Sequence, residues 1–409
     1  MPVKRLNKVK ENDQFGAAVA VVGGGPAGLV SAIALAAAGV ETLLIAPPAK
    51  PDHRTTALLA GSVAALEALG VWQACLPQAA PLKNIRIVDD TRRLFRAPEV
   101  FFASAEIGLE AFGCNIENRH LIAALEARAV ELRLPRIAAP ALVIESDPQG
   151  VTVTHAGGKL RVRLVIGADG QRSLARAAAG IGTRRRNYPQ TAITLNFGHA
   201  RAHDGTSTEF HTESGPFTLV PLPGRRSSLV CVLDPARASE FSAMSDAELS
   251  AVVERRAHSL LGPMTVETGR GVFPLAVETA DRMARERIAL VGEAAHTLPP
   301  IGAQGLNLGL RDGATVAEIV ADAQREDLDI GAPEVLARYE NARRADVMSR
   351  TLAIDLLNQS LLTDFLPVQG ARGLALYFAD RVGPLRRAIM REGVAPVASQ
   401  PRLTRGEMV

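Results

Sequence analysis

The sequence has few cysteines, few aromatic residues and little net charge. Its three cysteines, Cys75, Cys114 and Cys231, lie far apart and form no CxxC pair, so neither a disulfide framework nor a zinc site is expected. A reducing cytosol is the simplest compartment for them. Aromatic residues make up 4% of the chain and the formal net charge is +3, whereas nucleic-acid binding needs a concentrated basic face with stacking rings. We therefore expect no nucleic-acid partner.

Long apolar runs are scarce too, and the one near the N-terminus is interrupted. The uncharged stretch 15–40 follows several basic residues, which imitates a signal peptide or a membrane span. Three glycines and a proline, Gly23–Pro26, break it in the middle, as suits a strand, a turn and a helix. We expect a cytoplasmic chain without a transmembrane segment. Arginines flank apolar residues in a helix expected over 372–390, so peripheral contact with the inner face of a membrane is the minority alternative to ordinary packing.

Metal ligands are not expected either. His199 and His203 have HxxxH spacing, but they follow a strand-like run and precede Asp204 and Gly205. Outside a helix, four-residue spacing does not bring side chains together. We therefore predict polar loop residues and no metal site.

A glycine-rich turn near the start predicts a dinucleotide. The residues 17–22 have the composition of a buried parallel strand, and Gly23-x-Gly25-x-x-Gly28 follows directly, before a helix. The first glycine permits the tight turn, the second lets a pyrophosphate approach, and the third lets helix and strand touch. The next strand should end in an acid for the ribose hydroxyls, but Ala46 stands there. Binding is expected to be weaker, unless another group substitutes.

Three polar residues are further candidates for the same site. Asp169 follows a strand expected over 160–166 and precedes a helix, which places it at the carboxyl end of the strand, where α/β proteins bind ligands. Arg54 and Arg119 could reach a phosphate as rigid cationic forks. For both arginines a solvated loop position is the alternative.

The segment 287–313 organises the rest of the chain. A short apolar run, Ile288–Val291, reads as a buried strand, and the acid Glu293 follows the glycine at its end. A proline-containing loop then leads to a helix expected from Gln304. A helix N-terminus carries unpaired N–H groups and partial positive charge, so it stabilises an anion or an electron-rich ring. We interpret the segment as the site of a reduced flavin, with an ordinary strand-loop-helix crossover as the alternative.

Between residues 191 and 272 the pattern changes to β-rich alternation. We predict an α/β fold in which a Rossmann-like cofactor domain (15–80, 105–180 and 273–350) receives a mainly antiparallel β-sheet substrate domain (81–104 and 181–272). A helical region (351–395) completes the chain. No Ser/His/Asp triad or carboxylate pair stands out in the inserted part, so we predict no catalytic side chain and assign the chemistry to a cofactor.

Three motifs in order carry a family resemblance: GGGPAG (23–28), GADGQRS (167–173) and VGEAAHTLPPIGAQGLNLGLRDG (291–313). Together they resemble the FAD-dependent aromatic hydroxylases with the para-hydroxybenzoate hydroxylase fold. The third motif, with segments 52–58 and 117–121, looks most like the branch that hydroxylates ubiquinone precursors, the UbiH type. The resemblance covers nearly the whole chain, from Val19 to the final helices.

The resemblance implies FAD as the cofactor and a role for individual residues. Glu293 stands where the family usually has an aspartate, and at Ala303 and Pro299 a glycine and a histidine are more usual or frequent. Pro300, Gly302 and Ala303 would line the flavin. The residues expected to bind the cofactor are Gly23, Gly25, Gly28, Arg54, Arg119, Asp169, Glu293, Gly302, Gln304, Gly305 and Asn307.

The activity that the resemblance implies is an FAD-dependent monooxygenase. It would use O2 and a flavin hydroperoxide to hydroxylate the aromatic ring of a polyprenylated phenol or quinone precursor in ubiquinone biosynthesis. NAD(P)H or a protein electron donor would be the reductant, and a quinone-biosynthesis complex is a candidate partner. The alternatives are an FAD hydroxylase of a soluble aromatic compound and a non-catalytic, flavoprotein-like scaffold of a biosynthetic complex.

Overall fold

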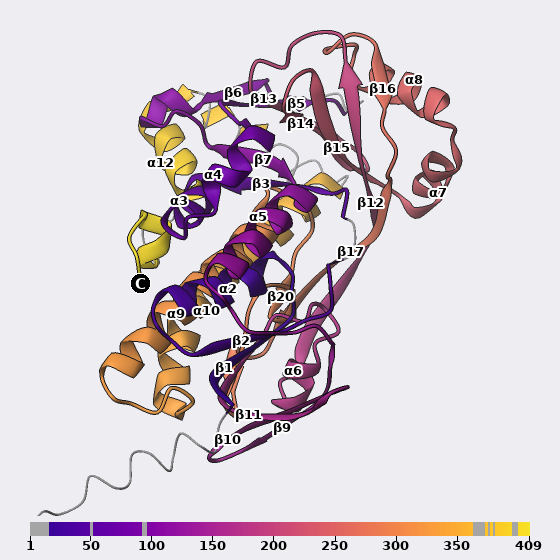
Figure 1. The fold of residues 1–409 in the computed structure, drawn as a ribbon. Helices are drawn as coiled ribbons and strands as arrows, with labels where there is room; N and C mark the ends of the chain where they lie inside the picture. The colour runs from indigo at the N-terminus through magenta and orange to yellow at the C-terminus, as the bar shows by residue number, and fades with distance from the viewer. Residues whose placement is uncertain are drawn as a thin grey trace, which may run out of the picture.

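The computed structural model describes residues 16–49, 52–91, 96–362, 373–374, 377–378, 381–394 and 400–409. These residues form three β-sheets with helices packed between and around them (Figure 1). In Figure 1 the strands β9, β10 and β11 lie at the bottom and β13 to β16 at the top right, with β12 and β17 running between the two regions. The predicted α/β fold with an inserted, mainly antiparallel sheet is confirmed.

The first sheet contains the glycine-rich turn. Its central strands are parallel, and β1 (Ala17–Val22) is buried along almost its whole length, as its run of alanines and valines predicts. The strand order is β18 (Ala284–Arg285), β19 (Ile288–Leu290), β11 (Gly158–Gly167), β1, β2 (Thr42–Ile45) and β8 (Arg136–Ile137), with β10 (Gly150–His155) and β9 (Ala141–Asp147) attached to β11. The helices α2 (Pro26–Ala37), α5 (Asn118–Glu131) and α9 (Gln304–Arg325) pack together beside this sheet, and the short α6 (Leu174–Ala178) contacts β9.

The second sheet is the inserted one. Its order is β20 (His296–Thr297), β17 (Gly271–Ala280), β12 (Thr183–His199), β15 (Arg226–Leu233), β14 (Gly215–Leu222), β13 (Thr206–Thr212), β5 (Asn84–Asp89) and β6 (Val100–Ala103), with β16 (Met264–Val266) on β12. One face packs its apolar side chains against α7 (Pro235–Ala243) and α8 (Asp246–Arg256). Strand β17 crosses the domain boundary expected at residue 272, so we propose that the inserted sheet extends to Ala280.

A third, small sheet joins the other two. It consists of β3 (Thr55–Leu59), β7 (Gly113–Glu117) and β4 (Ala79–Pro81), and it carries α3 (Ala60–Ala68) and α4 (Trp72–Cys75). Short 3-10 turns stand at Leu76–Gln78, Ser104–Ile107, Gly292–Ala294 and Arg402–Arg405.

Two helices follow the central segment. The helix α10 (Pro333–Leu362) has the bounds that its sequence predicts, and it packs on α9. The helix α12 (Gly383–Val394) covers part of the second helix expected near the C-terminus, whereas positions 372, 375, 376, 379 and 380 lie outside the described residues. In the part of the chain that the structure describes, no helix combines the length and the apolarity that crossing a bilayer requires.

One sequence prediction about side-chain positions was wrong. The ring centroids of His199 and His203 lie 5.7 Å apart, because β12 ends at His199 and the chain turns back. All four ring nitrogens have partners in the protein, however: the Arg201 carbonyl and the Ser227 hydroxyl for His199, and the Leu222 carbonyl and the Gly205 N–H for His203. No ring nitrogen of this pair is left for a metal.

Candidate cofactor and active site

Two helix N-termini open side by side at the centre of the molecule. A Cβ added to Gly309 of α9 would lie 3.3 Å from the Cβ of Ala27 in α2, and one added to Gly313 would lie 2.7 Å from Ser31 Oγ. Because these contacts advance together along both helices, α2 and α9 run in the same direction. Neither helix has a side-chain N-cap. Their free N–H groups and partial positive charges therefore face the same side, where an anion is stabilised.

The glycine-rich turn divides into packed and open positions. Gly23 has φ +119°, and a Cβ there would lie 2.2 Å from the Ala168 carbonyl oxygen; at Gly28 it would lie 2.1 Å from the Gly23 oxygen. These two glycines are required by the protein's own packing. At Gly25, the N-cap position of α2, an added Cβ would meet nothing within 4 Å. The space in front of Gly25 fits the approach of a pyrophosphate to the backbone.

The loop before α9 has the same open character. Gly302 (φ +63°) and Gly305 have nothing within 4 Å of an added Cβ, and Pro300 is exposed. Ala303 has φ +55°, a left-handed conformation that favours glycine. A glycine at this position would adopt the same backbone conformation without strain. Pro300, Gly302 and Gly305 leave a surface that a flat ring can approach.

Asn307 and Gln304 lie on α9 but turn their side chains into the protein. Asn307 is 2% exposed; its Oδ1 accepts from Leu59 N (2.9 Å) and Ser62 Oγ (2.6 Å), and its Nδ2 donates to the carbonyls of Ala57 (2.8 Å) and Ala303 (2.6 Å). The Asn307 side chain thus fastens the start of α9 to β3 and α3, and only its backbone can face a ligand. Gln304 Oε1 accepts a bond from Arg350 Nη1 at 3.0 Å.

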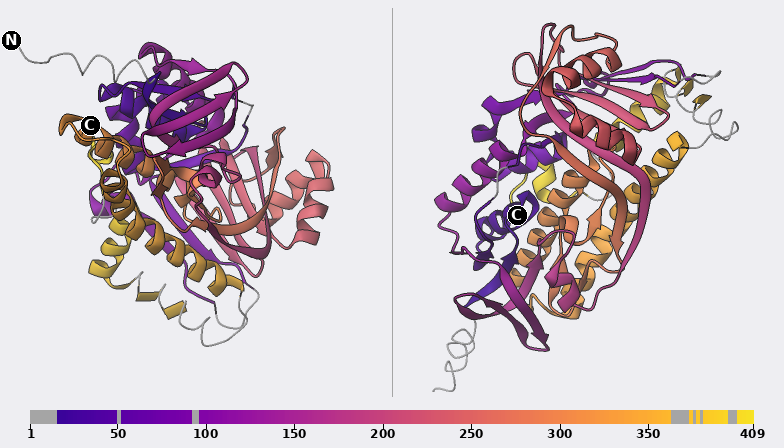
Figure 2. Two further views of the ribbon diagram at one scale, coloured as in Figure 1. Left: turned by 90° about the horizontal axis from the view of Figure 1, so that it is seen from below. Right: turned by 90° about the vertical axis from the view of Figure 1, so that its right-hand side faces the viewer.

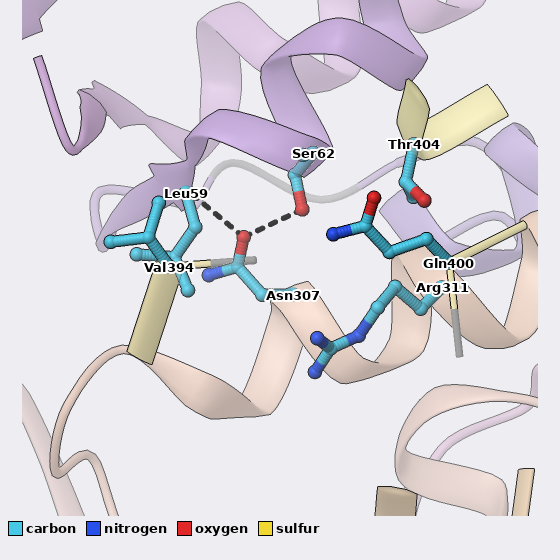
Figure 3. Close-up of a pocket in the computed structure, with 8 residues that line it drawn as sticks. Leu59, Ser62, Asn307, Arg311, Val394, Gln400 and Thr404 are labelled. Carbon is cyan, nitrogen blue, oxygen red and sulfur yellow. Dashed lines mark hydrogen bonds between the residues drawn. The ribbon is translucent and has the colours of Figure 1, made fainter. Parts of the chain in front are cut away.

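A cavity behind Asn307 is too small for a cofactor (Figure 3). Its volume of about 10 Å³ suits roughly one water molecule. Figure 3 shows the two bonds that the Asn307 Oδ1 accepts at its edge. The lining residues are Leu59, Gly61, Ser62, Asn307, Arg311, Val394, Gln400 and Thr404. We interpret this cavity as a packing gap behind the site.

Asp169 is brought to the glycine turn, and its carboxylate caps a helix. It accepts hydrogen bonds from Ser173 Oγ (2.5 Å), Leu174 N (2.6 Å) and Ala175 N (3.0 Å), at the start of α6. Its own N–H group lies 2.9 Å from the Cβ position at Gly23. The carboxylate therefore orders the end of β11 against the turn, next to the expected nucleotide site.

Arg54 and Glu293 are exposed residues that lie near enough to interact electrostatically. Arg54 is held by Asp52 (Nη2 to Oδ2, 2.7 Å), and its side chain is 48% exposed. The hydrogen bonds that Arg54 donates to Asp52 raise the pKa of Arg54 against the effect of burial, and the charges of Asp52 and Glu293 raise it further. Both residues are exposed, and a contact with a bound cofactor stays a prediction for each of them.

Arg119 lies in a separate charge network. It pairs with the buried Glu117 (3.0 Å), which also binds Arg226 (3.1 Å), and Arg226 binds Glu267 (2.7 Å). Its side chain is 47% exposed. The structure places Arg119 two residues after the end of β7, in the first turn of α5, and a contact with the cofactor stays a prediction.

Arg136 is a candidate that the sequence reasoning missed. Its guanidinium donates to the carbonyls of Ala46 (3.4 Å) and Pro47 (3.0 Å), and it lies 3.7 Å from a Cβ position at Gly24. Its carboxylate partner is Glu126. Arg136 and Glu126 therefore offer polar groups at the end of β2, where the acid replaced by Ala46 would stand. Little in the sequence indicated this position for Arg136, because β8 has only two residues and its pairing with β2 was not predicted.

A buried ionic cluster lies behind the N-terminus of α9. Asp312 accepts bonds from His296 Nε2 (2.6 Å), Gly292 N (3.0 Å) and Arg343 Nε (2.7 Å), and Asp312, His296 and Arg343 have fully buried side chains. Burial raises the pKa of Asp312, but the charges of His296 and Arg343 prevail and lower it to about 2. The cluster thus ties the 292–297 loop to α9 and α10.

The same cluster continues toward Gln304. Asp346 binds Arg343 (2.8 Å) and Arg350 (2.9 Å) and forms an ion pair with Arg311 (3.3 Å). Burial and the charges of Arg350 and Arg343 lower the pKa of Arg311 to about 10, despite Asp346. Three arginines meet two buried carboxylates here, and the exposed Glu392 pairs with Arg350 at 3.7 Å, so each arginine of the cluster has an acidic partner. The positive end of α9 itself therefore supplies the partial charge that favours a negative group in front of it.

The comparisons with known proteins agree with this geometry. The FAD binding domain family matches residues 16–352. The ubiquinone hydroxylase UbiL of Rhodospirillum rubrum is 37% identical, over 95% of this chain and 92% of the relative. The 3-demethoxyubiquinol 3-hydroxylase of Escherichia coli is 33% identical, over 91% of this chain and 97% of the relative. The fold of p-nitrophenol 4-monooxygenase PnpA from Pseudomonas putida DLL-E4 matches with a TM-score of 0.74, at 22% identity, over 92% of this chain and 97% of that structure.

The open glycine turn, the parallel pair of uncapped helices and the covering sheet define an FAD-dependent monooxygenase. The chain belongs to the FAD binding domain family, over more than half of its length. The resemblance to the FAD-dependent aromatic hydroxylases is confirmed. A non-catalytic scaffold is accordingly not favoured.

Replacing Gly302 tests the placement of the flavin loop. We expect Gly302→Leu to abolish FAD occupancy, because the side chain enters the open space and strains a backbone with φ +63°. Gly224→Leu is the matched control, since Gly224 has φ +76° and equally open space in the β14–β15 turn. The ratio of bound flavin absorbance to protein absorbance measures the effect. Normal occupancy in Gly302→Leu would show that the loop does not face the ring.

Arg136→Ala tests the group at the end of β2. Loss of a charged hydrogen-bond donor costs about 1.5 kcal/mol, so the Kd for FAD should rise about tenfold. Arg128→Ala is the control, because Arg128 also bonds a backbone carbonyl and a glutamate. Fluorescence titration of the apoprotein with FAD gives both values. An unchanged Kd for Arg136→Ala would exclude this arginine as the substitute.

Asp312→Asn tests the buried cluster. Removing one partner of a buried ion pair should lower the free energy of unfolding by about 3–5 kcal/mol. The control Asp322→Asn lies on the same helix in a half-exposed pair and should cost less than about 1 kcal/mol. Urea unfolding at neutral pH measures both changes.

The same variant has a pH signature. The folded pKa of Asp312 is about 2, below the ordinary 3.8, so its stabilising effect is complete above pH 3.8 and is lost as the pH falls through about 2. The stability difference between wild type and Asp312→Asn should therefore shrink in acid. A difference that stays constant down to pH 2 would contradict the charge-based role.

Proposed function

We propose that this monooxygenase hydroxylates the aromatic ring of a polyprenylated phenol or quinone precursor in ubiquinone biosynthesis. The two relatives named above are ubiquinone-pathway hydroxylases by name, and the alignments span nearly the full length of both chains. One structural observation supports the proposal most directly. At the N-termini of the parallel, uncapped helices α2 and α9, open space lies in front of three glycines: Gly25, Gly302 and Gly305.

We further propose how the protein's residues act toward FAD. The turn at Gly23, Gly25 and Gly28 holds the pyrophosphate, while Asp169 keeps β11 in place beside it. Asn307 fixes the start of α9, so its N–H groups point at one place in front of Gly302. When bound, FAD supplies the redox and oxygen-transfer chemistry that the side chains lack. The positive end of α9 favours the negative charge of its reduced form.

The inserted sheet suits an apolar aromatic substrate. A buried apolar cluster, Tyr188, Ala192, Val232 and Leu275, packs against Leu362 at the end of α10. These side chains lie on the side of the sheet opposite to the core covered by α7 and α8. They keep water away from this side of the sheet, next to which we propose that the aromatic ring binds.

The electrons must come from a reductant that binds outside the FAD site. The sequence contains no second GxGxxG motif, so we expect NAD(P)H to bind transiently, or a protein donor to supply the electrons. A quinone-biosynthesis complex and a peripheral membrane contact fit a substrate with a polyprenyl tail.

A deletion strain tests the function directly. Mass spectrometry of its lipid extract should show a prenylated precursor that lacks one ring oxygen, together with a loss of ubiquinone. Wild-type protein should restore ubiquinone, the Gly224→Leu variant should do so as well, and Gly302→Leu should not. Normal ubiquinone without a precursor in the deletion strain would favour a soluble aromatic substrate instead.

A further inference from the structure

The solvent-facing side of α10 changes character halfway along the helix. Its first half exposes Glu334, Arg338, Asn341 and Arg344, as an ordinary surface helix does. Its second half exposes apolar side chains over three helical turns. They are Met348 (60% exposed), Leu352 (59%), Leu356 (57%) and Leu357 (37%). On its inner side the same half buries Val347 and Ile354 beside the polar Arg350 and Asn358, so its apolar side chains are mainly on the solvent side.

The segment after α10 exposes more apolar side chains. They are Leu374, Tyr377, Phe378, Val382, Leu385 and Ile389. With the four residues of α10 they make up what we call the apolar face. In both views of Figure 2 the second half of α10 and the described pieces that follow it lie along one edge of the molecule. Arg350 of α10 also donates to the carbonyl of Glu392 in α12 at 3.1 Å. A soluble monomer rarely exposes so many large apolar side chains together.

Basic residues occur in the same segments as the apolar face. Arg344, Arg381, Arg387 and Arg391 are exposed there. Among the described residues of 344–362 and 381–394, Glu392 is the one exposed acid, and it pairs with Arg350. The Arg381 guanidinium stacks over the Tyr377 ring at 5.4 Å from its centroid. Apolar side chains accompanied by arginines are typical of a surface that enters the headgroup region of an anionic bilayer.

We propose that the apolar face docks on an anionic phospholipid membrane, with its leucines in the acyl boundary and its arginines at the headgroups. A second copy of the chain is the less suitable occupant. In a symmetric dimer both copies would bring their arginines to the same interface, and the like charges would repel.

The position of the apolar face would let a membrane-bound substrate reach the site, and this part of the inference rests on the proposed function. The inner side of α10 reaches the site: Arg350 binds Gln304 at 3.0 Å, and Asn358 binds Gln190 of β12 at 2.9 Å. One helix, about 10 Å thick, therefore separates the bilayer from the cofactor side. A polyprenylated substrate can keep its tail in the lipid while its ring enters beside α10.

Vesicle flotation of the FAD-loaded full chain tests the docking. We expect binding to phosphatidylcholine vesicles that contain about one-third phosphatidylglycerol, and little binding to phosphatidylcholine alone, because each arginine adds about fivefold to binding at an anionic surface. Leu352→Gln with Leu356→Gln should abolish binding. The matched control is Val130→Gln with Leu142→Gln, which removes two equally exposed apolar side chains elsewhere and should bind like wild type.

The charge contribution has its own pair of variants. Arg387→Gln with Arg391→Gln should lower binding to the anionic vesicles by about 25-fold. The control is Arg237→Gln with Arg255→Gln. These two exposed arginines belong to α7 and α8, which lie at the right-hand edge of Figure 1, opposite α12, so vesicle binding should be unchanged. Equal losses in both pairs would mean a non-specific effect of net charge and would overturn the proposed face.

Other outcomes separate docking from the enzyme's function. No vesicle binding by wild type, or a dimer in analytical ultracentrifugation that Leu352→Gln with Leu356→Gln dissociates, would overturn the proposal in favour of a protein partner. Hydroxylation of a short-prenyl analogue in solution should persist in that variant, because neither leucine belongs to the site. If the deletion strain makes normal ubiquinone while vesicle binding follows the variants, the proposed function fails and the docking stands.

Discussion

The close approach of α2 and α9 sets the geometry of the whole site. Two helices can bring their N-termini to one place only if nothing larger than a methyl group stands between them. Ala27 and the glycines 292, 309 and 313 meet this condition. Both sheets are then anchored to the pair: the first through β1 and β19, and the inserted one through the loop that leads from β20 into α9.

The buried charges behind α9 hold the loop that precedes this helix in position. Asp312 and Asp346 hold three arginines that would otherwise be costly to bury, and the network reaches from the 292–297 loop to Gln304. Such a cluster fixes positions as well as charge, because each carboxylate is bound by at least two partners. The backbone of the flavin loop is therefore held from behind by ion pairs and from the side by Asn307.

The sequence predicted the fold and the backbone part of the site because both depend on local signals. Glycine spacing, the apolar run of β1 and the strand-to-helix order at 288–310 are read within short windows. Arg136 and the partners of Asp312 could not be found in this way, since they come from strands and helices far apart in the chain. One signal was available: Arg343, Asp346 and Arg350 recur at helical spacing on the buried side of α10, where charges are unusual. Asn307 was correctly placed at the start of α9, but the sequence does not tell whether an amide binds a ligand or the protein.

The strands β12 and β17 pair from Thr183 and Ala280 to Thr194 and Gly271, and they cross from the cofactor side to the inserted sheet without a linker. Arg176 also donates to the Ala294 carbonyl and pairs with Glu278, which fastens the two regions again. A long two-stranded ribbon of this kind resists hinge bending. The ribbon shifts register once, between Asn187 and Thr191, and on either side of that point we expect it to limit movement between the two lobes, so that substrate entry and product release depend on side-chain and helix movements at the α10 edge.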